Sequence, residues 1–161
     1  MRLARGAAAV AFGAVMLLAA GGARASETAT CDVPIVHALP GGGAAQIDPR
    51  IDSLKTYLTK PPFTAWHDFK LLNRESLTLQ EGGSATFMLP NNRPATLTFV
   101  GHSVGPNEHR IRLRLVIEHP EKQHRVLDTT FVLDEGGVVL TVGHRHDNGV
   151  LILGVSCKTQ N

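Results

Sequence analysis

The sequence has few aromatic residues and few cysteines. Its 161 residues include six Phe but only one Trp, one Tyr and two Cys. The two cysteines, Cys31 and Cys157, do not form a CxxC motif, so a thioredoxin-like redox role has no support. The sequence also lacks a G-x-S-x-G nucleophile elbow, a Walker phosphate loop and an H-E-x-x-H metal motif. Without such a constellation, we expect a protein that is not an enzyme.

No apolar run is long enough for a membrane-spanning helix, which needs about 20 residues. The run at residues 7–20 is rich in Ala and Leu, follows a basic start with Arg2 and Arg5, and precedes Ala23-Arg24-Ala25. Small residues at the −3 and −1 positions after such a run are typical of a signal-peptidase site. The sequence therefore predicts a signal peptide over residues 1–25, cleavage before Ser26, and a periplasmic or secreted mature chain with no transmembrane segment.

An excess of positive charge is also missing from the mature chain. The full sequence has 16 Lys and Arg against 14 Asp and Glu, but Arg2, Arg5 and Arg24 lie in the predicted signal peptide. Their removal leaves 13 basic side chains against the same 14 acidic ones. This balance gives no electrostatic case for a nucleic-acid partner.

The two cysteines that are present lie near the two ends of the predicted mature domain. In an exported protein an isolated pair favours a disulfide, here between Cys31 and Cys157, although free thiols or metal ligation are the alternatives. We expect the bond to tie a short strand containing Val33 to Val36 to the last strand of the chain.

Strict alternation of apolar and polar residues is the strongest structural signal. In residues 111–117 every second side chain is Ile or Leu, and residues 125–134 continue the pattern after a polar, Pro-containing loop. This period predicts an antiparallel hairpin with one buried face. One register satisfies both faces, because it opposes Ile117 to Leu127 and Ile111 to Leu133 and also brings Arg114 near Asp128.

Further alternating segments predict about seven or eight strands in one β-rich domain over residues 26–161. Asp48-Pro49 is a typical helix start, so a single short helix near the N-terminus is expected over residues 48–59. Glu135-Gly136 predicts a hairpin pairing Leu133 with Val138, and Asn148-Gly149 predicts a two-residue turn. The expected fold is mostly β, an antiparallel β-sandwich or a small barrel.

The run from Ile47-Asp48-Pro49-Arg50 through Pro61-Pro62-Phe63 to Phe69-Lys70-Leu71-Leu72 resembles small exported β-domain proteins of unassigned function from Gram-negative bacteria. In those proteins a proline-aromatic linker follows a short helix and leads into a β-domain. The resemblance implies the same layout here and transfers no catalytic residues. The segment from Asp134 to Leu153 is also similar to the closing hairpins of outer-membrane secretins.

Eight histidines are many for a chain of this size. His144 and His146 are one residue apart, so on an extended strand both imidazoles point to one face, an arrangement that can chelate Zn²⁺ or Cu²⁺. His102 or His109, which flank a loop, could supply a further ligand. The alternative interpretation is a polar hairpin tip in water.

Arg110, Arg112 and Arg114 share one face of the first hairpin strand. They could bind an anionic polymer or an acidic protein surface, or they could be a solvated face balanced by Asp128 and Asp134. We expect a non-catalytic protein that binds an envelope protein or polymer and needs no cofactor. The alternative is a periplasmic copper- or zinc-binding protein.

Overall fold

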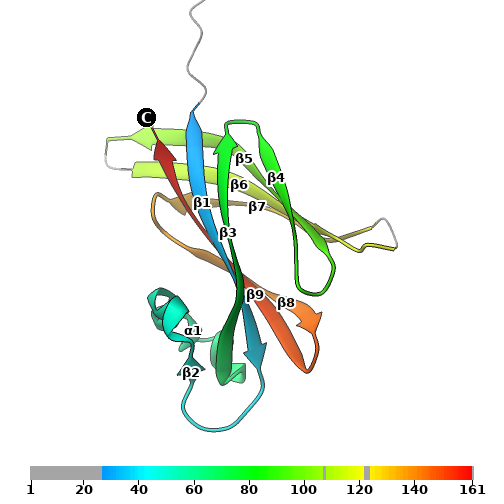
Figure 1. Cartoon of the computed structure of the whole chain (residues 1–161). Helices are drawn as coiled ribbons and strands as arrows, with labels where there is room; N and C mark the ends of the chain where they lie inside the picture. The colour runs from blue at the N-terminus through cyan, green and yellow to red at the C-terminus, as the bar shows by residue number, and fades with distance from the viewer. Residues whose placement is uncertain (1–26, 107, 122–123, 161) are drawn as a thin grey trace, which may run out of the picture.

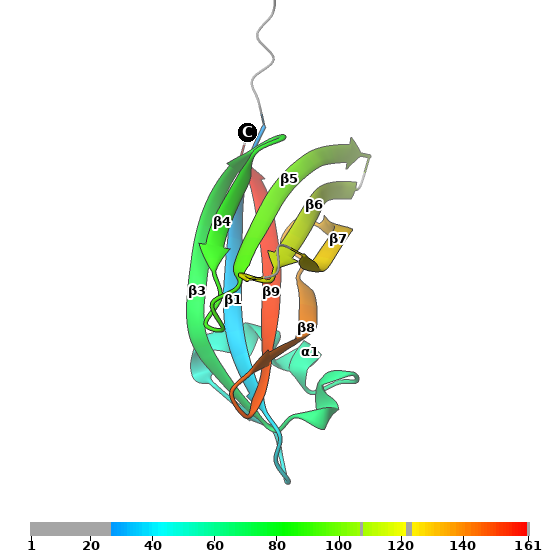
Figure 2. The same ribbon diagram turned by 90° about the vertical axis from the view of Figure 1, so that its right-hand side faces the viewer.

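The computed structural model describes residues 27–106, 108–121 and 124–160, which fold into two β-sheets facing each other (Figure 1). The predicted signal peptide, residues 1–25, lies outside the described residues. The five-stranded sheet has the order β2-β3-β1-β9-β8, and the four-stranded sheet has the order β4-β5-β6-β7. The strands of one sheet run across those of the other, as Figures 1 and 2 show.

The five-stranded sheet is built around the first and last strands. β1 (Thr28–Leu39) pairs antiparallel with β3 (Asp68–Gln80) on one side and with β9 (Gly149–Gln160) on the other. The edges are β2 (Gln46–Ile47), parallel to β3, and β8 (Val139–His146), antiparallel to β9. The chain termini of the domain therefore lie side by side in the centre of one sheet.

The four-stranded sheet is a meander of consecutive antiparallel strands. Its members are β4 (Ser84–Met88), β5 (Pro94–Gly105), β6 (Glu108–Glu118) and β7 (Arg125–Asp134). In each sheet the two outermost strands do not pair with each other. The structure is thus a two-sheet sandwich, and the small-barrel alternative is wrong.

The main core lies between the inner faces of the two sheets. Fully buried side chains from both sheets meet there, including Val33, Ile35, Phe99, Leu113 and Leu153. Alternation along each strand supplies this face, because every second side chain points inward. Burial of this apolar area is the dominant favourable contribution to folding.

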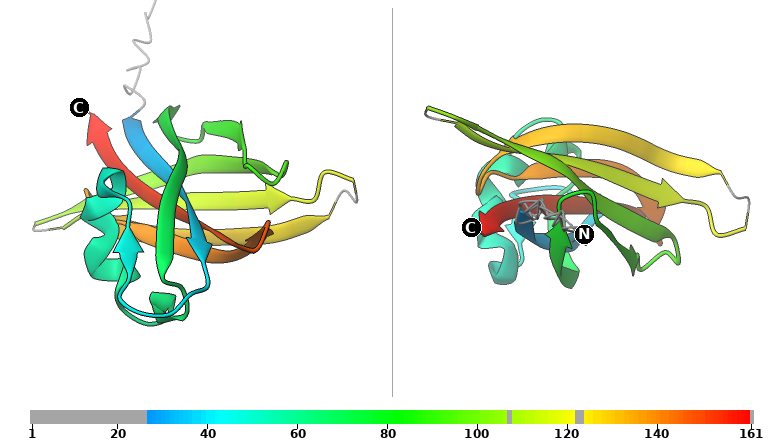
Figure 3. Two further views of the ribbon diagram at one scale, coloured as in Figure 1. Left: turned by 60° about the horizontal axis from the view of Figure 1, so that its bottom comes forward. Right: turned by 90° about the horizontal axis from the view of Figure 1, so that it is seen from above.

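A second, smaller core lies on the other face of the five-stranded sheet, beneath the helical segment (Figure 3). This segment comprises η1 (Pro49–Leu54), α1 (Lys55–Leu58) and η2 (Phe63–Ala65). Its buried residues Ile51, Leu54 and Leu58 pack in one cluster with Val36 and Ile152 of the sheet. The apolar residues on both faces of β1 and β9 are explained by these two cores.

The single helix expected near the N-terminus over residues 48–59 is only partly correct. Asp48 does cap it, accepting a hydrogen bond from the Arg50 amide at 3.0 Å. However, the segment follows β1 and β2 and lies in the middle of the described domain. It is a six-residue 3₁₀ segment followed by one turn of α-helix, and the 3₁₀ segment is itself kinked at Ile51 (φ −122°, ψ 25°).

The register of the β6–β7 hairpin is confirmed at every predicted pair. Ile117 opposes Leu127 and Ile111 opposes Leu133. The predicted hairpin across Glu135-Gly136 is wrong, because β7 and β8 belong to different sheets and β8 pairs with β9. Residues 135–138 carry the chain from one sheet to the other.

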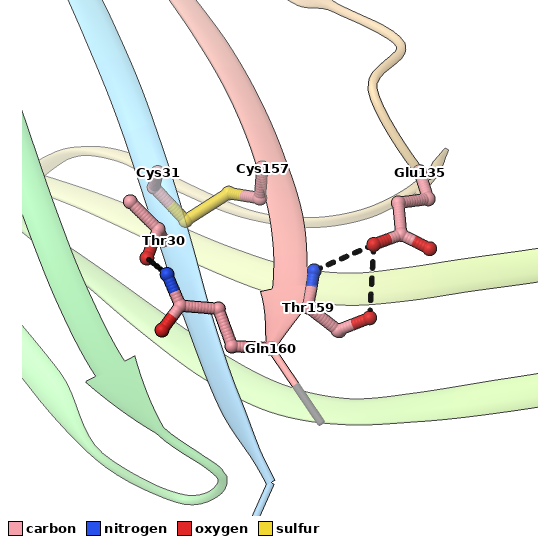
Figure 4. Close-up of a disulfide and its surroundings, with 6 residues drawn as sticks. All are labelled: Thr30, Cys31, Glu135, Cys157, Thr159 and Gln160. Carbon is pink, nitrogen blue, oxygen red and sulfur yellow. Dashed lines mark hydrogen bonds between the residues drawn. A yellow bond between two sulfur atoms is a disulfide. The ribbon is translucent and has the colours of Figure 1, made fainter.

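The Cys31–Cys157 disulfide is confirmed (Figure 4). The two residues are directly opposite each other on β1 and β9, with their Cα atoms 4.1 Å apart, and both are buried in the main core. The bond joins residues 126 positions apart in the sequence. A disulfide of this kind is consistent with an oxidising compartment.

Candidate functional site

Three side chains that can ligate a metal meet at one end of the space between the sheets. His102 is on β5, His109 is on β6 and Glu135 follows β7, and one donor atom of each lies within 4.8 Å of a donor atom of each of the others. No other group of three such residues occurs within residues 27–106, 108–121 and 124–160. The cluster is therefore the candidate metal centre.

Strand register brings these residues together. The irregularity between Phe99 and Gly101 resets the alternation of β5, so that His102 opposes the buried Ile111. His109 lies two residues before Ile111, and Glu135 lies two residues after the buried Leu133. All three positions thus continue the inward-facing parity of the four-stranded sheet just beyond its apolar core.

The other sheet supplies Glu27 from the residue before β1. Its Oε1 lies 2.7 Å from Nδ1 of His102, whose side chain is only 3% exposed. The second ring nitrogen of His102, Nε2, is buried without a hydrogen-bond partner among the described residues. Glu27 precedes Ala29 and Cys31, both buried, at the same parity, so it too belongs to an inner face.

Thr159 of β9 fixes the carboxylate of Glu135. The Thr159 amide and hydroxyl donate to Oε1 at 2.8 and 2.9 Å (Figure 4). The other oxygen, Oε2, lies 3.7 Å from Nδ1 of His109. The two hydrogen bonds from Thr159 are the largest causes that lower the pKa of Glu135, so that its carboxylate is ionised at neutral pH.

The sequence predicts part of this cluster. His102 and His109 are possible additional ligands on sequence grounds, whereas Glu27 and Glu135 are not among the predicted residues. The parity of β7 could have placed Glu135 on the inner face. Nothing in the sequence places Glu27 beside His102, because that contact depends on how the two sheets pack.

The predicted ligands His144 and His146 lie on β8, in the other sheet. His144 is buried opposite Leu151, and its Nδ1 has no hydrogen-bond partner among the described residues. His146 is half-buried, and its ring lies 5.0 Å from that of His37 between centroids. No group of three metal-ligating residues within the described chain includes this pair. Metal binding by His144 and His146 stays a prediction.

Burial, and then the charge of Arg93, lowers the pKa of His144 below its ordinary value of 6.5. Between the lowered native pKa and about 6.5, the unfolded chain binds a proton that the native protein does not. We therefore expect His144 to lower the free energy of unfolding as the pH falls below about 6.5. Urea unfolding of the wild type and of His144→Leu at several pH values measures this dependence.

The free energy of unfolding of His144→Leu should depend less on pH in that window than that of the wild type. The same substitution at the exposed His124 is the control and should leave the pH dependence unchanged. Identical pH profiles for wild type and His144→Leu would contradict the assignment.

The arginine face consists of Arg110, Arg112 and Arg114 on the outer side of β6. Arg114 donates two hydrogen bonds to Asp128, both at 2.7 Å. Arg110 lies 3.1 Å from Glu108 and 3.5 Å from Asp134. The sequence-based expectation of counter-charges on this face is therefore confirmed for these two arginines.

Arg112 differs from its two neighbours. Within the described residues it forms no ion pair, although it is exposed between Gly101 of β5 and Val132 of β7. A shallow pocket of about 120 Å³ opens there, lined by Gly101, His102, Ser103, Arg110, Arg112 and Val132. An uncompensated guanidinium beside a pocket is available to an anionic group from outside the chain.

Comparison of the chain with protein-family models, curated proteins and solved structures found no match. The resemblance to small exported β-domain proteins therefore stays a prediction. None of the helices in the described part of the chain has the length and apolar character needed to cross a bilayer.

Proposed function

We propose that the protein is an exported, non-catalytic binding module that holds a carboxylate-bearing envelope protein or polymer against the arginine face. The observation that carries the proposal is Arg112, which forms no ion pair among the described residues and lies beside the pocket lined by Ser103 and Val132. Arg110, which also lines the pocket, and Arg114 already have carboxylate partners within the chain. Arg112 has none among the described residues, so its donors can face an external anion.

The chemistry of the pocket favours a planar anion. A guanidinium presents donors in a fork that matches a carboxylate, and the Ser103 hydroxyl can add one more hydrogen bond. Val132, which is 47% exposed, offers apolar contact at the same rim. The scaffold is a disulfide-tied sandwich, so the face is already formed before a partner arrives.

The proposal predicts that Arg112→Ala weakens binding of acidic polymers about tenfold, the equivalent of one charge-assisted hydrogen-bonded contact. Fluorescence anisotropy with labelled polyglutamate and polygalacturonate measures this, and the two probes distinguish an acidic protein surface from an acidic polysaccharide. Binding should weaken with rising salt, since exposed charges are screened.

Arg145→Ala is the matched control. It removes the same charge from an exposed position on β8 of the other sheet, and it should leave the affinity unchanged. Equal losses in Arg112→Ala and Arg145→Ala would indicate only a general charge effect. If neither polyglutamate nor polygalacturonate binds, the proposal is refuted.

A further inference from the structure

We propose that His102, His109 and Glu135, with Glu27 orienting His102, form a site for a divalent ion of the zinc class at the open end between the two sheets. The proposed ligands face the space between the sheets, whereas Arg112 is on the outer side of β6. His102 is the one proposed ligand that also borders the pocket beside Arg112. The proposal therefore does not depend on the proposed function.

His102 has the arrangement of a metal-bound imidazole. Its Nδ1 lies 2.7 Å from the Glu27 carboxylate, so Nδ1 carries the proton and Nε2 presents its lone pair. Metal-ligating histidines commonly donate their other ring N–H to a carboxylate in this way. Nε2 is buried in a side chain that is 97% shielded from solvent and has no hydrogen-bond partner among the described residues. A metal ion would satisfy this otherwise costly lone pair.

Hydrogen bonds also fix the orientation of the Glu135 carboxylate. Thr159 occupies Oε1 with two hydrogen bonds, which leaves Oε2 to face His109. The 3.7 Å between Oε2 and the His109 Nδ1 is close to the roughly 3.3 Å that two donors on one tetrahedral ion have with metal bonds of about 2.0–2.1 Å. One donor atom of each residue lies within 4.8 Å of the others, so a bound ion would draw them closer together.

The donor types select the class of ion. Two imidazoles and one carboxylate suit Zn²⁺ and Cu²⁺, whereas Ca²⁺ and Mg²⁺ require oxygen ligands. Three protein ligands leave a fourth position free for water or an external group. The His109 side chain is 54% exposed, which gives the ion a route from solvent.

The position of the site gives the ion a structural consequence. His102, His109 and Glu135 extend from the four-stranded sheet, whereas Glu27 and Thr159 belong to the ends of β1 and β9 in the five-stranded sheet. A bound ion would therefore strengthen the contact between the sheets at the end where the disulfide already joins β1 to β9.

The test is titration calorimetry of the tag-free exported protein, stripped with chelator, with Zn²⁺, Cu²⁺ and Ca²⁺ in separate experiments. We expect one Zn²⁺ per chain with a Kd below about 10 μM, tighter binding of Cu²⁺, and no binding of Ca²⁺. A His102→Ala/His109→Ala double variant should bind Zn²⁺ at least about 100-fold more weakly, a loss of about 2.7 kcal/mol. Zn²⁺ should also raise the unfolding temperature of the wild type and not that of the variant.

The matched control is His144→Ala/His146→Ala, which also removes two histidines and should leave the Zn²⁺ affinity unchanged. Loss of binding in this control, or a wild-type Kd above about 10 μM, would overturn the proposal. Glu135→Gln removes the charged ligand without altering the shape of the side chain, so it serves as the test if the first double variant fails to fold. Unchanged Zn²⁺ affinity in Glu135→Gln would also overturn the proposal.

Glu27 is a positioning residue, and its test uses a readout that folding alone would not change. Glu27→Gln should weaken Zn²⁺ binding about 10-fold, the usual range for an orienting partner being about 10–100-fold. In ¹⁵N NMR spectra of the wild type, Zn²⁺ should shift Nε2 of His102 while Nδ1 remains protonated. A shift on Nδ1 instead would contradict the assigned orientation.

Discussion

Replacing Cys31 and Cys157 together by alanine should lower the free energy of unfolding by about 4 kcal/mol and leave both sheets formed. The bond closes a loop between residues 126 positions apart, and in the chain-entropy model a loop of about 100 residues corresponds to about 4.7 kcal/mol. Alanine is preferred to serine because both cysteines are buried in the main core, where a hydroxyl would lack a partner.

The sheets should survive because most of their pairing is independent of the bond. β5, β6 and β7 are joined by consecutive turns, and β8 pairs with β9 next to it in the chain. The strand most affected is β1, whose start is held against β9 at Cys31. Hydrogen exchange in the variant should therefore rise first in residues 28–33.

Urea unfolding followed by circular dichroism measures the change in stability. Ser156→Ala is the control for substitution at the end of β9 and should cost less than about 1 kcal/mol. A loss below 1 kcal/mol in the double variant, or loss of its β-sheet spectrum before urea is added, would contradict this prediction.

Gly149→Ala should destabilise the protein by about 3 kcal/mol or more. A Cβ at this position would clash with the backbone carbonyl of Ala38, and it would also lie 2.9 Å from Nε2 of His37 and 3.1 Å from the Leu39 side chain. The carbonyl belongs to β1 and cannot move without displacing the central strand. Overpacking that must shift backbone is at the upper end of the usual 1–3 kcal/mol.

Gly42→Ala is the matched control, because a Cβ there would meet nothing within 4 Å. It should be neutral or slightly stabilising, since it restricts the unfolded chain. Thermal unfolding of both variants gives the comparison. A Gly149→Ala variant as stable as Gly42→Ala would show that β1 and the start of β9 do not approach as closely as described.

The role of Gly149 also shows where sequence patterns mislead. Asn148-Gly149 predicted a two-residue turn, but Asp147 and Asn148 form the turn and Gly149 already pairs with His146. Its need for glycine comes from a neighbouring strand far away in the sequence. A turn motif could not reveal that contact.

The alternation of apolar and polar residues was enough to predict the β6–β7 hairpin, but it was not enough to predict the connection from β7 to β8. The register of β6 and β7 follows from matching two faces at once, and all its predicted pairs are present. β7 and β8 show similar alternation, but alternation does not say to which sheet a strand belongs. The apolar character of both faces of β9 was the better guide, because it requires layers on both sides.

The candidate metal centre was only partly predictable for a related reason. His102 faces inward because of an irregularity in β5 that no motif marks. Its partner Glu27 comes from the opposite sheet, and the pairing follows from sheet packing. The histidines with the clearest spacing, His144 and His146, belong to no three-ligand group in the described chain.

The most direct test of the proposed binding function is an NMR titration of the ¹⁵N-labelled exported protein with polyglutamate. We expect chemical-shift changes confined to the outer face of β5, β6 and β7. They should be largest at Ser103, Arg112 and Val132 and absent from the Arg145 region of β8. Chemical-shift changes spread over both sheets, or no changes at the highest polyglutamate concentration, would contradict the proposed binding function.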